Sequence, residues 1–195
     1  MRLFDIIKTL DHFDVPMHTL NENELKNKNY CYAIVIPTDK LALFRGIKPS
    51  GNHKDVGVYV IDCDLTVFHE ANKAINFEAT EQIEKIIRKN IQLHDGEYAL
   101  AFAVFSILHE IGHIKHLQNS QMSFQEYYDT YQKDWDNIYK EYLFMYKLYG
   151  TTQERIKEVN SLYGEKYRSH AFESYADEFA IQHLEECMDK LRNIK

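Results

Sequence analysis

The sequence predicts an α+β fold in which a small, mostly antiparallel sheet packs on a helix bundle with an inserted long helical hairpin. Short β-branched and aromatic runs are confined to residues 30–69, whereas helical periodicity extends from residue 80 onward. With 195 residues, of which 45% are hydrophobic, the chain is long enough for one substantial core. We therefore expect a single domain over residues 1–195, with the helical insertion at about 119–166.

The first part of the chain combines one helix with the strands. Apolar residues recur at helical spacing in residues 2–12, which predicts a short amphipathic helix that ends before Pro16. The runs "YCYAIVIP", "LALFRGI" and "VGVYVI" are separated by polar turns and predict three strands. Residues 65–68, "LTVF", are a candidate fourth strand, so three or four strands are expected between residues 30 and 69.

Helices follow, each with its own start and stop signals. Isoleucines spaced three or four apart after Thr80 predict one helix, and the next begins near Glu97. Two capping-box patterns predict the hairpin, and its first helix repeats an aromatic residue every three or four positions. That aromatic stripe, from Phe124 to Tyr146, is either the inner face of a packed helix or the lining of a substrate or partner groove. The two capping boxes are Ser123 with Glu126 and Thr151 with Glu154, and the helices that they start end at Gly150 and Gly164. A last helix is expected from Ser169 to about Leu191.

Composition excludes several classes of function. The net charge is −7 and no Lys/Arg cluster is present, which disfavours direct binding to nucleic acid. The longest apolar stretch, residues 98–108, is too short to span a membrane, and the N-terminus lacks the apolar core of a signal peptide. Three cysteines at unrelated spacings predict reduced thiols. We expect a cytoplasmic protein.

The motif "HEIGH" follows directly after the apolar run "YALAFAVFSIL". Residues four apart project from one face of a helix, so His109 and His113 can offer two imidazole nitrogens to one metal ion. Glu110 lies about a hundred degrees round the helix, where it would reach a water on the metal instead of the metal itself. The alternative is that these are surface residues at the point where the helix leaves the core.

A catalytic zinc site needs a third ligand, and the last helix supplies a candidate. Glu173 and Asp177 fall on the apolar face of that helix, where carboxylates are not normally found. We expect Glu173 to bind the metal and Asp177 to accept the N–H of a liganding histidine. The alternative is an Arg or Lys partner for these carboxylates inside the core.

Further histidines and tyrosines are weaker candidates. His116 is too far along the helix from His109 for both to join His113 on one ion, so a surface or supporting position is expected. His170 is either a donor to a transition-state oxyanion or an ordinary first-turn residue. The same two interpretations apply to Tyr163 and Tyr167.

"HEIGH" and "ESYADEFA" together resemble the zinc metallopeptidases of the gluzincin kind, and most closely the ImmA/IrrE family. Glu173, Ala176, Phe179 and Ala180 match the E-x-x-A-x-x-F-A pattern of that family. The resemblance implies a cytoplasmic endopeptidase, often from a phage or other mobile element, that cleaves a helix-turn-helix repressor. Sixty residues separate His113 from Glu173, more than is usual in that family, so a soluble relative of the longer-spaced HExxH…ExxxD peptidases stays open.

The resulting hypothesis is a Zn²⁺-dependent endopeptidase that acts on a regulatory protein. Zinc would be held by His109, His113 and Glu173, and Glu110 would be the general base that takes a proton from the attacking water. Substrate would lie extended along a sheet edge formed by one of the strands in residues 56–69.

Two other hypotheses stay open. One is a metal-binding regulatory module that binds a transcription factor or another partner protein without turnover. The other is a structural protein whose HEIGH is accidental, which predicts no metal and no coupling of metal to folding. The ligand types also suit manganese or iron.

Overall fold

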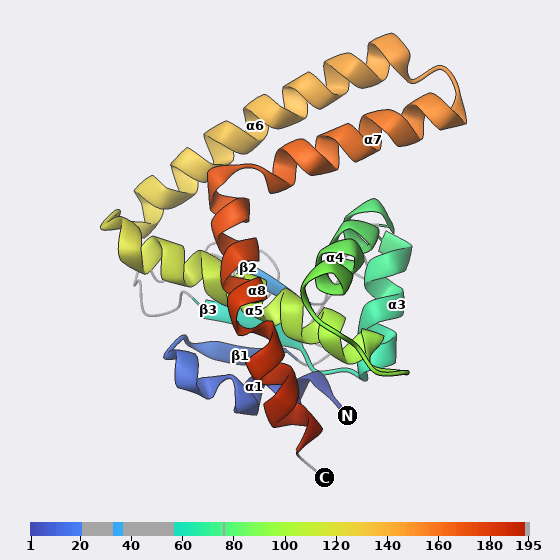
Figure 1. Cartoon of the computed structure of the whole chain (residues 1–195). Coiled ribbons are helices and arrows are strands. Elements are labelled where there is room, and N and C mark those ends of the chain that lie inside the picture. The colour runs from blue at the N-terminus through green and yellow to red at the C-terminus, as the bar shows by residue number, and fades with distance from the viewer. Residues whose placement is uncertain (21–32, 37–56, 76, 194–195) are drawn as a thin grey trace.

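The computed structural model describes residues 1–20, 33–36, 57–75 and 77–193. Within these residues, seven α-helices, one 3-10 helix and three short strands follow one another along the chain (Figure 1). In order they are α1 Leu3–Thr9, η1 Asp11–Phe13, β1 Met17–Leu20, β2 Ala33–Ile36, β3 Gly57–Ile61, α3 Leu65–Ile75, α4 Phe77–Asn90, α5 Tyr98–Ser120, α6 Phe124–Tyr149, α7 Gln153–Arg168 and α8 Ala171–Arg192.

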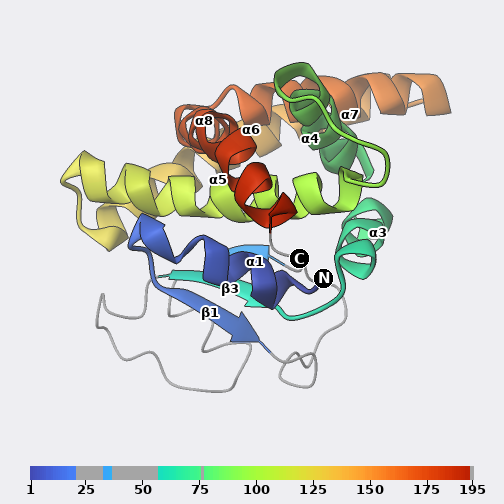
Figure 2. The ribbon, with the colours of Figure 1, turned by 60° about the horizontal axis from the view of Figure 1, so that its bottom comes forward.

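Helix α5 is the centre of the molecule. It contacts α8, α3, α4 and α1, and it also packs on β2 and β3. Figure 2 shows α5 running between the other long helices on one side and the strands with α1 on the other. The apolar run that opens α5 has side chains on every face of the helix, and almost all of residues 101–108 are completely buried. A helix that is apolar all round is stable only when neighbours cover it on all sides.

Helices α5 and α8 pack closely because small residues face each other where they cross. A Cβ atom added to Gly112 would lie 2.8 Å from the Cα of Ala176 and 3.2 Å from the Cβ of Phe179. A side-chain atom cannot lie this close to a backbone atom. Only a glycine at position 112 therefore permits the two helices to approach so closely. The close contact places the two histidines of HEIGH opposite the first turns of α8.

The predicted fold class is wrong, because the protein is mostly α-helical. The strands are only four or five residues long, and they are ordered β1-β3-β2 with β1 parallel and β2 antiparallel to β3. The three strands therefore form neither a major layer of the fold nor a mostly antiparallel sheet. The sequence interpretation gave too much weight to short apolar runs, whereas the core is organised by the longer buried helix α5.

The predicted strand at residues 65–68 is also wrong, since helix α3 begins there. Asp64 accepts a hydrogen bond of 2.9 Å from the backbone N–H of Thr66, and this local bond stabilises a helix start. Leu65 and Phe68 are buried one turn apart on the same face. Strand β1 was not predicted, and the run predicted as a strand at 41–47 lies outside the described residues.

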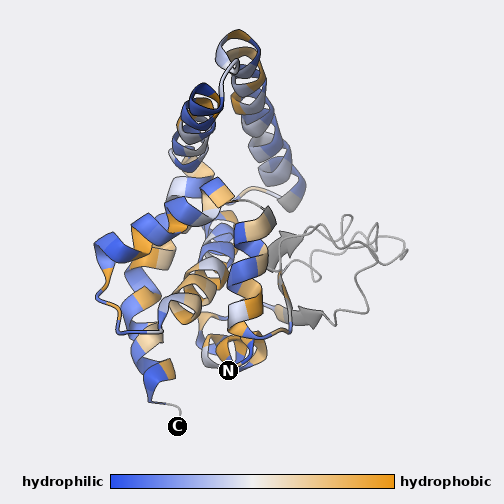
Figure 3. Cartoon of the chain, turned by 90° about the vertical axis from the view of Figure 1, so that its right-hand side faces the viewer, coloured by the Kyte–Doolittle hydropathy of each residue, from blue (hydrophilic) through white to orange (hydrophobic). Residues whose placement is uncertain are grey.

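Helices α6 and α7 form an antiparallel pair that extends away from the rest of the chain (Figure 1). The predicted capping box at Ser123 and Glu126 is confirmed, with the serine hydroxyl accepting from the glutamate N–H and the glutamate accepting from the serine N–H. At the second helix the cap is Thr152, one residue later than predicted. In Figure 3 the residues of this hairpin are mostly hydrophilic, with isolated apolar residues among them.

Most of the aromatic stripe of α6 is covered by the rest of the chain. Tyr127 and Ile138 are buried, Trp135 and Tyr142 are half-buried, and Tyr146 near the end of the helix is exposed. Packing therefore explains most of the stripe. No helix among the described residues is long and apolar enough to cross a membrane. The extent of the domain stays a prediction.

We expect Gly112→Ala to destabilise the protein by roughly 1–3 kcal/mol, because the added methyl group overlaps the α8 backbone. Intrinsic helix propensity has the opposite effect, because it favours alanine over glycine by about 1 kcal/mol. Urea unfolding measures the change. Gly164→Ala in α7 is the matched control, because there the new methyl meets only the side chain of Gln82, which can move. Equal stability of the two variants would contradict the close contact.

Candidate metal centre

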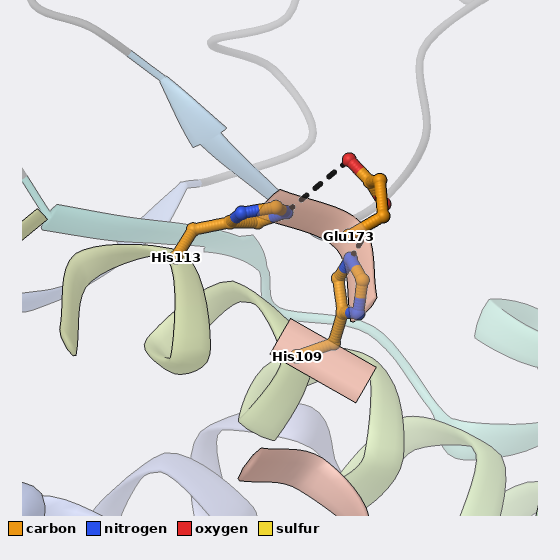
Figure 4. Close-up of side chains that lie close together, drawn as sticks. All are labelled: His109, His113 and Glu173. Atoms are coloured by element: carbon orange, nitrogen blue, oxygen red, sulfur yellow. Dashed lines mark ion pairs between the residues drawn. The ribbon is translucent and has the colours of Figure 1, made fainter. Parts of the chain in front are cut away.

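The structure brings His109, His113 and Glu173 together. Nε2 of His109 lies 3.3 Å from Oε2 of Glu173, and Nε2 of His113 lies 3.5 Å from Oε1. In Figure 4 both imidazoles project from α5 toward the carboxylate on α8. One ligand atom from each residue lies within 4.8 Å of the others, close enough to share one ion. The three residues predicted as ligands therefore form one cluster, although Glu173 lies sixty residues after His113 in sequence.

Asp177 lies where the sequence predicted, one turn after Glu173, and orients His109. Its Oδ1 is 2.9 Å from Nδ1 of His109 and accepts a hydrogen bond from that nitrogen. A proton on Nδ1 leaves the lone pair of a neutral imidazole on Nε2, the atom that faces Glu173. Arg168 donates to the same Asp177 oxygen at 2.6 Å, so the proposed alternative of a basic partner is correct for Asp177.

Glu173 is almost completely buried, with 1% of its surface exposed, and within the described parts of the chain no Lys or Arg is paired with it. Tyr131 from α6 donates a hydrogen bond of 3.0 Å to Oε1, and Tyr167 from α7 donates one of 2.8 Å to the same atom. An unpaired buried carboxylate would cost several kcal/mol, so these hydroxyls and the imidazoles are needed to keep it charged.

The charges of the cluster favour a cation at its centre. Burial would raise the pKa of Glu173, but the hydrogen bond to His109 and the charges of both histidines hold it well below its usual range. Burial lowers the pKa of His109, but hydrogen bonds to Asp177 and Glu173 outweigh it and raise the pKa to about 9. Burial, together with the positive charge on His109, lowers the pKa of His113 to about 4. When no metal is bound, the proton on His109 therefore supplies the positive charge at the centre of the cluster.

The donor set fits a zinc ion. Two neutral imidazole nitrogens and one carboxylate oxygen are a common three-ligand set for catalytic zinc, with a fourth position left for water or substrate. A second, independent feature is the Asp177 hydrogen bond to His109, since liganding histidines almost always donate their other N–H to a carboxylate or carbonyl group. The same ligands also suit iron or manganese.

Glu110 lies beside this cluster. It follows His109 directly on α5, its side chain is half-buried, and its charge raises the pKa of both His109 and Tyr131. It is not one of the three residues whose ligand atoms converge. Glu110 therefore lies where a general base beside a metal site is expected, and not where a metal ligand is expected.

The remaining sequence candidates have other partners. Nε2 of His170 lies 3.2 Å from Asp134 on α6, and the residue is the N-cap of α8. His116 stacks on Tyr175 at 4.5 Å between ring centroids and contacts Tyr127, so it belongs to an aromatic cluster. Tyr163 packs against Tyr142 at 4.6 Å in the hairpin. The site contacts of Tyr131 and Arg168 were not predicted, because each depends on how the hairpin crosses α8.

Comparisons with known proteins identify no relative. No protein-family model matches the chain, and no curated protein or solved structure matches it either. The argument for function therefore depends on the geometry of the cluster.

Zinc binding should release about one proton per ion between pH 5 and 8, because the ion replaces the proton on Nε2 of His109. His109 is mostly protonated below its pKa of about 9, so the apparent affinity should rise roughly tenfold per pH unit across this range. His113, with a pKa of about 4, contributes no proton there. Calorimetry in buffers of different ionisation enthalpy counts the protons, and pH-independent affinity would contradict the assignment.

Proposed function

We propose that this protein is a zinc-dependent endopeptidase of the kind that the ImmA/IrrE resemblance implies. The observation that carries the proposal is the convergence of His109, His113 and Glu173, with Glu110 next to them and Asp177 behind His109. All five positions were expected from the sequence pattern alone, and the fold brings four of them into mutual contact. The proposed compartment is the cytoplasm, where the buried thiols of Cys63 and Cys187 would stay reduced.

The protein side chains divide the chemistry between them. His109, His113 and Glu173 would hold the zinc ion, which would supply Lewis-acid activation of a peptide carbonyl and of water near neutral pH. Glu110 would accept a proton from the attacking water and return it to the leaving amine. Asp177 and Arg168 fix His109, and the tyrosines fix Glu173, so the ligands are held in place before substrate arrives.

The expected binding of substrate along a strand of residues 56–69 is not retained in the proposal. Strand β3 pairs with β1 on one side and with β2 on the other, and residues 65–68 are helical. A paired strand has no open edge to which a peptide could add. A protein substrate of the helix-turn-helix repressor type remains part of the proposal, supported by the resemblance alone.

Glu110→Gln should abolish hydrolysis and leave zinc binding nearly intact, because an amide cannot accept the proton but retains the shape of the side chain. A loss of at least 100-fold in kcat is expected, measured on a candidate repressor encoded beside this gene. Glu178→Gln is the matched control, since that glutamate lies exposed on α8. Full activity of the Glu110 variant would remove its role as the base.

Protein purified without a chelator or a histidine tag should carry about one equivalent of zinc. His113→Ala should lose most of it, since only two ligands remain, while His94→Ala should not, because His94 is exposed and outside the cluster. Metal analysis by mass spectrometry gives the stoichiometry. A wild-type protein that takes up no metal even with zinc in excess would overturn the proposal.

The two experiments also separate the enzyme from the regulatory alternative. A metal-binding module without turnover predicts zinc at His113 with no cleavage of any candidate partner, and no difference between wild type and Glu110→Gln. A structural protein predicts no zinc at all.

A further inference from the structure

Three oxygen atoms form a triangle at the inner end of the hairpin. They are the hydroxyls of Tyr131 and Tyr167 and Oε1 of Glu173, separated by 2.8, 2.9 and 3.0 Å. Each tyrosine comes from a different helix of the hairpin, and the carboxylate comes from α8. Every edge of the triangle is short enough for a hydrogen bond.

The number of protons decides how the triangle is bonded. Two hydroxyls supply two protons, so only two of the three edges can be hydrogen bonds at one time. A hydrogen bond to a carboxylate is roughly twice as strong as one between neutral groups, so both protons point to Oε1. Burial and the charge of Glu173 raise the pKa of both tyrosines, which keeps both protons in place.

Two donors fill the two lone pairs of Oε1. Nε2 of His109 lies 3.3 Å from the other oxygen, Oε2, while Nε2 of His113 lies 3.5 Å from Oε1. Because Oε1 already accepts two hydrogen bonds, Oε2 is the oxygen left to bind an ion. A carboxylate held in this way binds through one oxygen and keeps the coordination number low, which suits a zinc site that must accept a further ligand.

We propose that Tyr131 and Tyr167 are positioning residues that restrict Glu173 to a single metal-binding oxygen and so link the metal site to the α6–α7 hairpin. This inference rests on the metal site of the proposed function, but it does not require peptidase activity. Hairpin docking and metal binding then support each other, since both act on the same carboxylate.

The test compares Tyr131→Phe, Tyr167→Phe and the double variant with Tyr142→Phe. Tyr142 is the matched control because its hydroxyl also makes a hydrogen bond inside the hairpin, to Asn160 at 3.1 Å, without contacting Glu173. Each site variant should bind zinc about 10-fold more weakly, and the double variant up to about 100-fold, in competition with a chromophoric chelator. Circular dichroism of the metal-free proteins checks that all are folded.

Two further readouts respond to positioning and not to a general loss of stability. Cobalt bound to the double variant should absorb less strongly in the visible range, because the freed carboxylate can bind with both oxygens and raise the coordination number. Zinc should also slow hydrogen exchange in α6 and α7 of the wild type, and slow it less in the double variant.

The outcomes separate this inference from the function on which it rests. If wild type binds zinc and the double variant matches Tyr142→Phe in affinity, cobalt spectrum and exchange, the positioning role is overturned while the metal site stands. If wild type binds no zinc, the metal site and this inference fail together. Weaker zinc binding with an altered cobalt spectrum, confined to the two site tyrosines, supports the inference.

Discussion

The close crossing of α5 and α8 is the constraint on which the site depends. Gly112 allows the backbone of Ala176 to approach to a distance that no side chain would permit, and both residues are fully covered. On one side of this contact, α5 presents His109 and His113, and α8 presents Glu173 and Asp177 opposite them. A separation larger by the thickness of one methyl group would pull the pairs apart, so packing and chemistry are set by the same contact.

A buried cluster of charged groups is unfavourable unless each group has a partner, and here both carboxylates have more than one. Asp177 is paired with both Arg168 and His109, while Glu173 is paired with two imidazoles and two hydroxyls. Replacing such a cluster by apolar residues would stabilise many proteins. Its presence in this core therefore argues for a use other than stability, which the proposed metal binding would supply.

How much was predictable from the sequence depended on whether the signal was local. That His109, His113, Glu173 and Asp177 lie together could be predicted, because helical spacing alone puts them on one face of each helix and because a carboxylate on an apolar stripe is unusual. The sheet was overestimated because the apolar pattern at Leu65 and Phe68 is short enough to fit a strand or a buried helix. The site role of Tyr131 could not be found, because it depends on the angle at which the hairpin returns to α8.

The charge balance of the cluster gives Glu110 a role in both states of the site. Without a metal, the negative charges of Glu173 and Asp177 are balanced by Arg168 and by the proton on His109. When a divalent cation replaces that proton, the cluster gains one positive charge. The carboxylate of Glu110 is close enough to raise the pKa of His109, and it would offset part of that charge without binding the ion. In the proposed mechanism the same carboxylate would accept a proton from water at the ion.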